Sequence, residues 1–313
     1  MLKNYFKIAW RNLFRNKGFS LTNILGLTIG MTCTILIFLW VQDELTYDKF
    51  HANYKNIYQV IANRDFNNQV FTDRNMVLPL AKSLESGYPQ IKNAAVITYN
   101  EPHVLAYEDT KLKRSGYTVS EHYFNIFTWK FIKGNAATPI SDPSSIVLTQ
   151  SAAKALFGDA DPINKVVKID NDYNLKVTAI LADVPGNSTF QFDFIKPFDY
   201  SLPYIKQAMN EWTNSSWNVF VQTVPGADIK LLDKNINAVK KRHDPNDKVS
   251  TYFTFPISKW RLYSDFKDGK NIGGMIEYVR LFTIIALIIL LIACVNFMNL
   301  STARSEKEQK KLV

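Results

Sequence analysis

The sequence predicts an α+β extracytoplasmic domain between two transmembrane α-helices, and three observations support this fold class. Two stretches of the 313-residue chain carry no charged residue, Gly18–Gln42 and Leu281–Ala303. As a helix, each stretch is roughly 35 Å long, which is enough to cross a hydrocarbon core of about 30 Å. The sequence between them mixes strand-like and helix-like patterns in irregular order. Basic residues are in excess on the terminal side of each stretch, before the first and after the second.

The basic residues beside the two stretches predict which side of the membrane the domain occupies. Residues 1–42 contain five basic and no acidic residues, residues 279–313 contain five basic and two acidic ones, and the formal net charge of the chain is +9. Cationic flanks stay on the cytoplasmic side, which places both termini inside and the domain outside. The predicted order is a cytoplasmic amphipathic segment, a first transmembrane helix, an outer domain, a second transmembrane helix and a cytoplasmic tail, at residues 1–18, 19–42, 43–278, 279–303 and 304–313.

The first segment has basic residues at four-residue spacing beside an apolar face, namely Lys3, Lys7, Arg11 and Arg15. This period predicts a short amphipathic helix on the cytoplasmic membrane surface, with a plain basic anchor flank as the alternative. The apolar stretch that follows is longer than the roughly 7–15 residues of a signal-peptide core, and no small-residue cleavage site comes after it. We therefore expect a retained membrane anchor.

Small and polar residues within the two spans predict helix–helix contacts. Gly26 and Gly30 form a GxxxG pattern, which lets a second helix approach closely, although the pattern also arises by chance in apolar segments. Asn296 and Asn299 would be costly facing lipid, so we expect them to face another helix.

The outer domain shows strand and helix signals with recognisable ends. Apolar residues from Leu45 to Tyr58 keep a helical spacing, which predicts that the first helix continues out of the membrane. The run 170–172 between two β-rich segments predicts a hairpin, and Asp228 predicts a helix N-cap. The predicted strands are 58–63, 94–99, 145–148, 166–169, 175–180 and 217–224, and the predicted helices are 76–85, 151–157 and 229–241.

Common catalytic and ligand-binding signatures do not occur in the sequence. There is no phosphate-binding loop, no H-E-x-x-H and no nucleophile elbow, and the four histidines are scattered. Both cysteines, Cys33 and Cys294, lie in the apolar stretches, so we expect neither thiol catalysis nor a disulfide framework. We expect no catalytic, cofactor-binding or metal site, and no nucleic-acid partner, because the basic charge belongs to the membrane flanks.

One block of the chain combines Phe157, Gly158, Asp161, Pro162 and Lys165. Four weaker motifs accompany it along the chain: Trp10-Arg11-Asn12-Leu13, Tyr47–His51, Val184–Phe194 and Ala293–Arg304. In this order they resemble FtsX-family ABC transporter permeases with a MacB-like periplasmic core domain. The resemblance covers nearly the whole chain.

The resemblance implies a mechanical role in the bacterial inner membrane. In such permeases a separate cytoplasmic ABC ATPase hydrolyses ATP, two permease units pack together, and the spans relay motion to the periplasmic domain for export or cell-envelope regulation. The implied partners are an ABC ATPase subunit, a second permease unit and membrane lipid. The resemblance implies no enzyme activity for the permease itself.

The sequence also departs from the family pattern at its end. Arg304 and Glu306 begin as the family's ATPase-coupling segment does, but the sequence ends at Val313, before the third and fourth spans of a complete unit. We therefore expect an N-terminal, truncated portion of a permease. Two other functions stay open: a two-span membrane receptor or sensor, which needs a long cytoplasmic output module, and an uncoupled membrane-tethered binding module.

Overall fold

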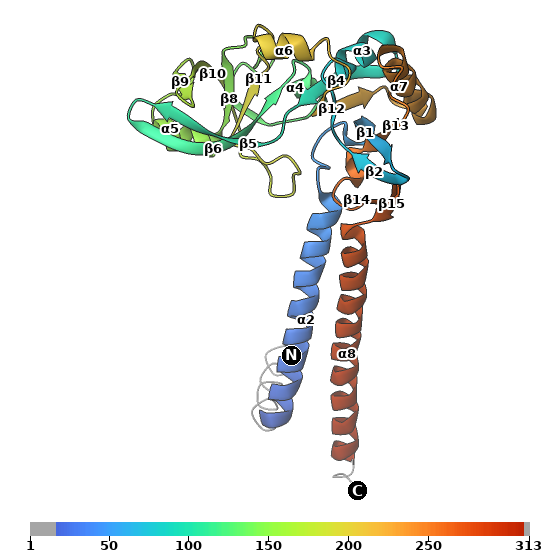
Figure 1. Ribbon diagram of the computed structural model, residues 1–313. Helices are drawn as coiled ribbons and strands as arrows, with labels where there is room; N and C mark the ends of the chain where they lie inside the picture. The colour runs from blue at the N-terminus through green and yellow to red at the C-terminus, as the bar shows by residue number, and fades with distance from the viewer. Residues whose placement is uncertain (1–16, 310–313) are drawn as a thin grey trace. The chain divides into compact units, whose positions relative to one another are not determined.

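The computed structural model describes residues 17–309, and the chain forms two compact units (Figure 1). We call residues Thr46–Gly274 the head. The other unit contains the long helices α2 (Lys17–Thr46) and α8 (Met275–Gln309), apart from the last residue of α2. The predicted amphipathic helix at residues 1–18 lies almost wholly outside the described residues.

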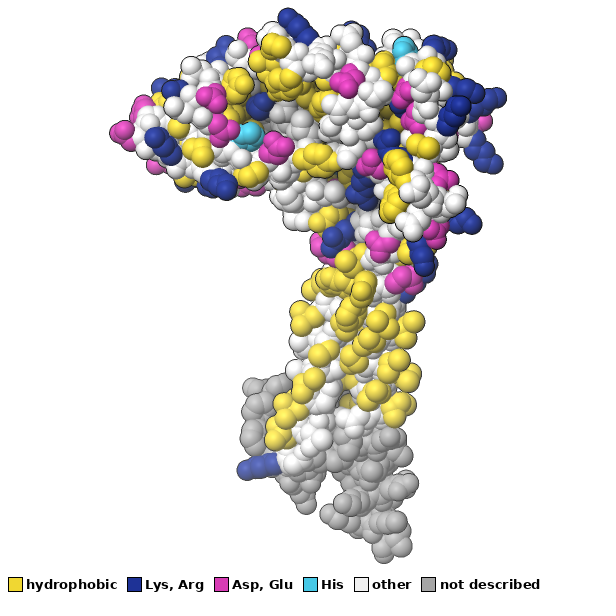
Figure 2. Space-filling model, in the orientation of Figure 1, with side chains coloured by type: hydrophobic (Ala, Val, Ile, Leu, Met, Phe, Trp, Pro, Cys, Tyr) yellow, Lys and Arg dark blue, Asp and Glu magenta, His cyan; other side chains and the backbone are white. Residues whose placement is uncertain are grey.

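Both long helices are long and apolar enough to cross a membrane, over Ser20–Thr46 and Met275–Met298. Hydrophobic side chains cover the visible face of these helices, whereas acidic and basic side chains are spread over the head (Figure 2). Most side chains of the two apolar stretches are exposed in the absence of lipid, since only 6% and 11% of each hydrophobic window is buried. These properties fit two transmembrane helices on either side of the head in the sequence.

One part of the head is an open antiparallel sheet in the order β4-β12-β1-β13, with β2 paired to β1 and β3 paired to β12. Side chains alternate along β1, so Val60 faces one core while Ile61 faces another. Helices α3 (Leu80–Gly87) and α7 (Ile229–His243) cover the Val60 face. The strands are Ile57–Phe66 (β1), Gln69–Asp73 (β2), Met76–Val77 (β3), Ile91–Ile97 (β4), Ser215–Thr223 (β12) and Ser250–Pro256 (β13).

The other part of the head is a closed barrel of six strands. Pairing runs β5-β6-β11-β8-β10-β9 and returns to β5, so the ring has no free edge. Helix α5 (Gln150–Phe157) contributes to the barrel core and β7 (Phe131–Gly134) adds to β10. The barrel strands are Glu101–Tyr107 (β5), Thr110–Val119 (β6), Ser145–Thr149 (β8), Val166–Ile169 (β9), Tyr173–Leu181 (β10) and Phe194–Pro197 (β11).

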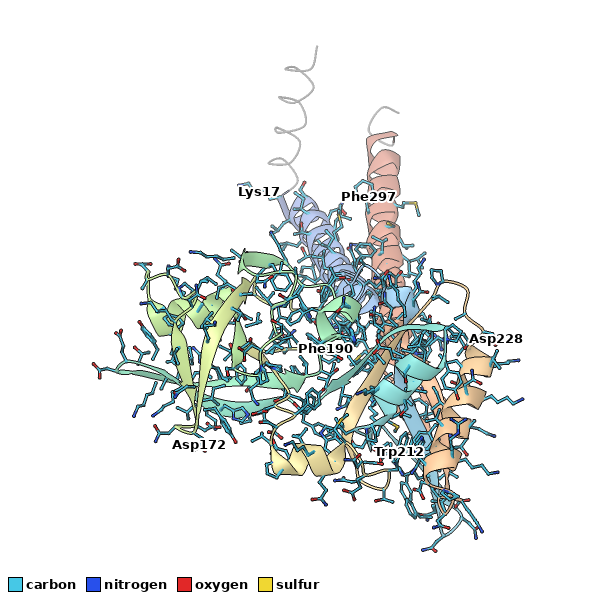
Figure 3. All side chains as sticks on the ribbon, turned by 90° about the horizontal axis from the view of Figure 1, so that it is seen from above. Lys17, Asp172, Phe190, Trp212, Asp228 and Phe297 are labelled. Carbon is cyan, nitrogen blue, oxygen red and sulfur yellow. The ribbon has the colours of Figure 1, made fainter. Side chains whose placement is uncertain are left out.

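A largely aromatic core joins the sheet and the barrel. It contains Phe127, Phe190 and Phe220, and the single strand contact between Ile97 of β4 and Val119 of β6 lies in it. Phe190 lies among densely packed side chains of the head in Figure 3. The remaining elements are Tyr54–Asn56 (η1), Tyr123–Ile126 (α4), Pro203–Ala208 (α6), Ile257–Lys259 (η2), Asp265–Lys267 (β14) and Lys270–Gly273 (β15).

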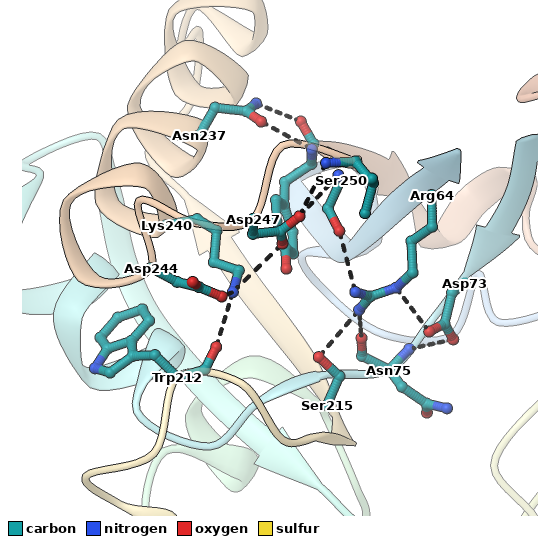
Figure 4. A network of polar contacts seen from close by, with 12 residues as sticks. Arg64, Asp73, Asn75, Trp212, Ser215, Asn237, Lys240, Asp244, Asp247 and Ser250 are labelled. Atoms are coloured by element: carbon teal, nitrogen blue, oxygen red, sulfur yellow. Dashed lines mark hydrogen bonds and ion pairs between the residues drawn. The ribbon is translucent and has the colours of Figure 1, made fainter. Parts of the chain in front are cut away.

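Two polar clusters, at the end of α7 and at the end of β1, are joined through Asp247 and Ser250 into one network (Figure 4). Lys240 is 6% exposed, and its ammonium donates to the Trp212 carbonyl at 2.8 Å and to Asp244 at 2.5 Å. Arg64 donates to Asp73 at 3.1 Å and to Ser215 at 3.0 Å. A buried charge is tolerated only with such partners, so these clusters serve the packing of the head.

Local signals in the sequence predicted several elements correctly. The hairpin of β9 and β10 surrounds residues 170–172, and all six predicted strands coincide with observed ones within a few residues. Asp228 caps α7 as predicted, by accepting from the N–H groups of Lys230 and Leu231. The structure adds a second cap, Thr149, which accepts from the Ala152 N–H at the start of α5. The caps satisfy amide groups that a helix start leaves without partners.

Two predicted helices were wrong in part. The helix expected over 76–85 begins only at Leu80, because Met76 and Val77 are fully buried and pair with β12. The first long helix does not continue to Tyr58, since it ends at Thr46 and Asp48 adopts a left-handed φ of 59°.

Candidate functional site

The chain forms a tight connection where it enters the head after α2. Asp48 donates its backbone N–H to the Asn187 carbonyl at 2.9 Å. Its carboxylate accepts from the Thr189 N–H at 2.7 Å and from the Thr189 hydroxyl at 2.5 Å. We call residues 46–54, together with residues 187–189 and Thr128, the joint.

The Asp48 carboxyl group is held in the interior of the joint, with the residue 2% exposed. Burial raises the pKa of this carboxyl group, while its hydrogen bonds from Thr189, the nearby Ser188 hydroxyl and the charge of Arg261 act in the opposite direction. The Arg261 guanidinium lies 4.7 Å from the centre of the Tyr47 ring. Through these hydrogen bonds, the buried carboxylate connects the segment after α2 to residues 187–189.

His51 supplies the second anchor of the joint and is 1% exposed. Its Nδ1 accepts from the Thr128 N–H at 3.1 Å, and the Ala52 N–H donates to the Thr128 hydroxyl at 3.1 Å. The rings of Phe127 and Trp129 lie 5.2 Å and 5.1 Å from the imidazole. Burial lowers the pKa of His51 to about 4, so the imidazole is neutral at pH 7.

The segment that carries Thr189 is itself fixed to the aromatic core. Phe190 is 6% exposed, and its ring lies 4.9 Å from Phe127 and 5.7 Å from both Phe220 and Trp260. The residues directly after the first apolar helix are therefore connected, through Asp48 and Thr189, to the core shared by the barrel and the sheet. Such an arrangement can transmit displacement, because packed interiors are only slightly compressible.

Three of the four predicted helix-packing residues, Gly26, Gly30 and Asn296, lie where α2 and α8 approach each other. A Cβ atom added at Gly26 would lie 2.9 Å from Asn296 Nδ2, and one added at Gly30 would lie 2.7 Å from Ala293 Cβ. The Thr34 hydroxyl contacts the Ala286 carbonyl at 3.4 Å. The side chains of Asn299, Arg304 and Glu306 lie outside the described part of the chain.

The residues that carried the family resemblance shape one end of the barrel. The Phe157 ring lies 4.5 Å from Tyr107, and Gly158 ends α5 with a φ of 61°. Asp161 accepts from Lys133 at 2.7 Å, and the Lys165 N–H donates to the Pro162 carbonyl at 3.1 Å. These contacts give the block a structural role in the barrel.

Sequence reasoning missed the joint. Asp48 and Thr189 are 141 positions apart, and neither segment has a pattern that names its partner. One signal in the sequence could have indicated the joint: Tyr47–His51 and Val184–Phe194 both belong to the motifs of the family resemblance.

Replacement of Gly30 by leucine should weaken the association of the two apolar helices. The new side chain would occupy the space of Ala293, whose Cβ lies 2.7 Å from the added Cβ position. Close backbone approach drives helix association in lipid, and forcing a larger side chain into a packed contact costs roughly 1–3 kcal/mol, so we expect a loss of this size. The measurement is energy transfer between labelled helix peptides in bilayers. Gly18→Leu is the matched control, because its added Cβ meets no atom of the described residues within 4 Å. Equal association of both variants would show that the Gly30 contact does not drive pairing.

Comparison with known proteins identifies the domain. The family model for the MacB-like periplasmic core domain matches residues 20–239. The crystal structure of a domain of a protein described as a permease, from Porphyromonas gingivalis, is 19% identical, with a TM-score of 0.58 over 66% of this chain and 93% of that one. The periplasmic region of MacB from Actinobacillus actinomycetemcomitans is 17% identical, with a TM-score of 0.45 over 64% of this chain and 88% of that one. No curated protein matches the sequence.

The family match covers more than half of the chain, and the fold of the P. gingivalis domain agrees with that of the head. The residue pattern, the head and the two apolar helices thus lead to the same assignment: the chain belongs to the family of MacB-like periplasmic core domains of ABC transporter permeases.

Proposed function

We propose that this chain relays motion from a separate cytoplasmic ABC ATPase to its head, for export or for regulation of the cell envelope. The joint carries this proposal. Asp48 lies two residues beyond the end of α2, and its carboxylate and N–H bind residues 187–189, which precede the core residue Phe190. A displacement of this segment would therefore reach the aromatic core through short, part-buried hydrogen bonds.

The proposed arrangement has transmembrane helices at residues 19–42 and 279–303, both termini in the cytoplasm and residues 43–278 in the periplasm. The two uncharged stretches and their basic flanks support this orientation. A reporter fused after Gly134 should be active only outside the inner membrane, and one fused to the C-terminus only inside. The opposite pattern would refute the orientation.

The proposed partners are an ABC ATPase subunit, a second permease unit and membrane lipid, and Arg304 and Glu306 belong to the proposed contact with the ATPase. The full chain should recover an ABC ATPase in a pull-down from its native membrane. A combined Arg304→Ala and Glu306→Ala variant should recover much less. Failure of the well-folded wild-type chain to recover any ATPase would exclude the coupling.

The relay itself requires a second measurement, because binding of an ATPase does not show that motion is transmitted. Asp48→Ala should leave ATPase recovery unchanged and abolish the nucleotide-dependent change in hydrogen exchange of residues 184–192. Asp109→Ala, at an exposed position outside the joint, is the matched control and should behave like the wild type. An unchanged nucleotide response in Asp48→Ala would show that motion does not pass through the joint.

A further inference from the structure

The closed barrel of the head has one end filled and one end open. Helix α5 follows the last residue of β8 and places Leu156 and Phe157 in the barrel core. The residues before β8, the tip of the β9–β10 hairpin and the last residues of β11 instead surround a cavity of about 390 Å³. This volume lies within the range of roughly 300–1,000 Å³ that is typical of small-ligand pockets, and barrel mouths are a common place for them.

Strand alternation places polar side chains in this mouth. Leu105 and Phe194 are core residues of the barrel, each 1% exposed. His103 and Glu101 lie two and four positions from Leu105 on β5, and Lys196 lies two positions from Phe194 on β11. Because successive side chains point to opposite faces of a strand, these three side chains share the inner face of the barrel at the open end.

Lys196 lacks a partner in this cavity. Its ammonium forms no hydrogen bond or ion pair with another residue in the part of the chain that the structure describes, although the side chain is largely buried. Burial lowers the pKa of Lys196, while Glu101, Asp199 and Asp170 oppose this effect through their charges. A desolvated ammonium without an acceptor gains most from an oxygen atom supplied by a ligand.

The rest of the mouth favours positive charge. Both carboxylate oxygens of Asp170 already have partners within the protein, since one accepts from the Val104 N–H at 2.8 Å and the other contacts His103 at 2.5 Å. Glu101, Asp172 and Asp199 add three further carboxylates to the lining, against the single ammonium of Lys196. An anion alone would be repelled by this excess, whereas a ligand that also carries a cation would be attracted.

Two tyrosines give the mouth an aromatic rim. Tyr173 and Tyr204 both line the cavity, with 49% and 63% of their surfaces exposed. An exposed tyrosine ring offers apolar contact to a ligand and a face to its ammonium group.

We propose that the open end of the barrel binds a small zwitterion of amino-acid or short-peptide size. The ligand's carboxylate accepts from the Lys196 ammonium, its ammonium pairs with the carboxylates of Glu101 and Asp199, and its body lies against Tyr173 and Tyr204. This site lies within the head and does not depend on coupling to an ATPase.

The test uses the full chain in lipid nanodiscs and the dipeptide glycyl-tyrosine as the probe, measured by titration calorimetry. The wild type should bind the dipeptide. N-acetylation removes the ligand's ammonium and C-terminal amidation removes its carboxylate, and each should weaken binding by about tenfold or more, since hydrogen bonds to charged groups contribute roughly 1.5–3 kcal/mol.

The Lys196 variants decide which group holds the carboxylate. Lys196→Met should weaken binding of glycyl-tyrosine about tenfold or more and should change binding of the amidated dipeptide little. Lys196→Arg keeps the charge and should retain most of the affinity. Lys92→Met, at an exposed position on β4, is the control and should bind like the wild type. The proposal is wrong if the wild type does not bind the dipeptide at 10 mM, or if Lys196→Met or either blocked dipeptide binds with unchanged affinity.

Discussion

Phe190→Ala should lower the free energy of unfolding of the head by about 3–5 kcal/mol, the usual cost of truncating a phenylalanine in a core. The ring is 6% exposed and packs against Phe127, Phe220 and Trp260, so its removal leaves a cavity where the sheet and the barrel meet. Urea-induced unfolding of the full chain in nanodiscs, followed by tryptophan fluorescence, measures this change.

Phe71→Ala is the matched control for this prediction. The Phe71 side chain on β2 is 55% exposed, so its truncation should change the free energy of unfolding by no more than about 0.5 kcal/mol. Equal unfolding midpoints for Phe190→Ala and the wild type would show that the aromatic core does not hold the head together. A destabilised Phe190→Ala variant should also exchange amide hydrogens faster at residues 187–189, because the loop that binds Asp48 loses its anchor.

Acidification should destabilise the head through His51. Burial lowers its pKa from 6.5 to about 4, so between these values the unfolded chain binds a proton that the folded head does not. Stability from this group is therefore lost as the pH falls from about 6.5 towards 4, and a pKa change of this size corresponds to about 3 kcal/mol at most.

Asp48 changes the pH dependence of the unfolding free energy in the opposite direction to His51. Its pKa is raised by burial, so the folded head takes up a proton at a higher pH than the unfolded chain does, and this uptake adds stability as the pH falls. The wild type should therefore lose less unfolding free energy on acidification than the titration of His51 alone would cause.

His51→Asn isolates the histidine contribution, because the asparagine side-chain oxygen can accept from the Thr128 N–H without titrating. The difference in unfolding free energy between pH 7 and pH 4.5 should be smaller in this variant by about 2–3 kcal/mol. His243→Asn is the control, since His243 is exposed, and it should retain the pH dependence of the wild type. If His51→Asn and the wild type lose the same stability, His51 does not control the acid response.

Local rules explain the part of the fold that the sequence predicts well. The β9–β10 hairpin and the cap at Asp228 depend on residues within a few positions of one another. The apolar helices depend on composition over 23 to 25 residues. In each case the interaction that decides the structure is short-range, so its signal lies in one window of sequence.

The long-range features could not be predicted in this way. Strand β6 includes the basic residues Lys111, Lys113 and Arg114, so its sequence does not show the apolar pattern of a barrel strand. Strand β11 has only four residues, which is too short for a clear strand signal. The joint and the Lys196 cavity depend on which distant segments meet, and that follows from packing of the whole head. The helix expected beyond Thr46 failed for the same reason, because Asp48 is held by residues 187–189.

The closed ring of strands has a consequence for synthesis of the protein. Its final member, β11, pairs with β6 through residues 116–119, about 80 positions earlier in the chain, and with β8. Until residues 194–197 have been synthesised and have folded, the edges of β6 and β8 have no strand between them, and such edges can pair with other chains. The barrel therefore completes late, after slow non-local pairing, and its unpaired edges are most exposed to association with other chains during this interval.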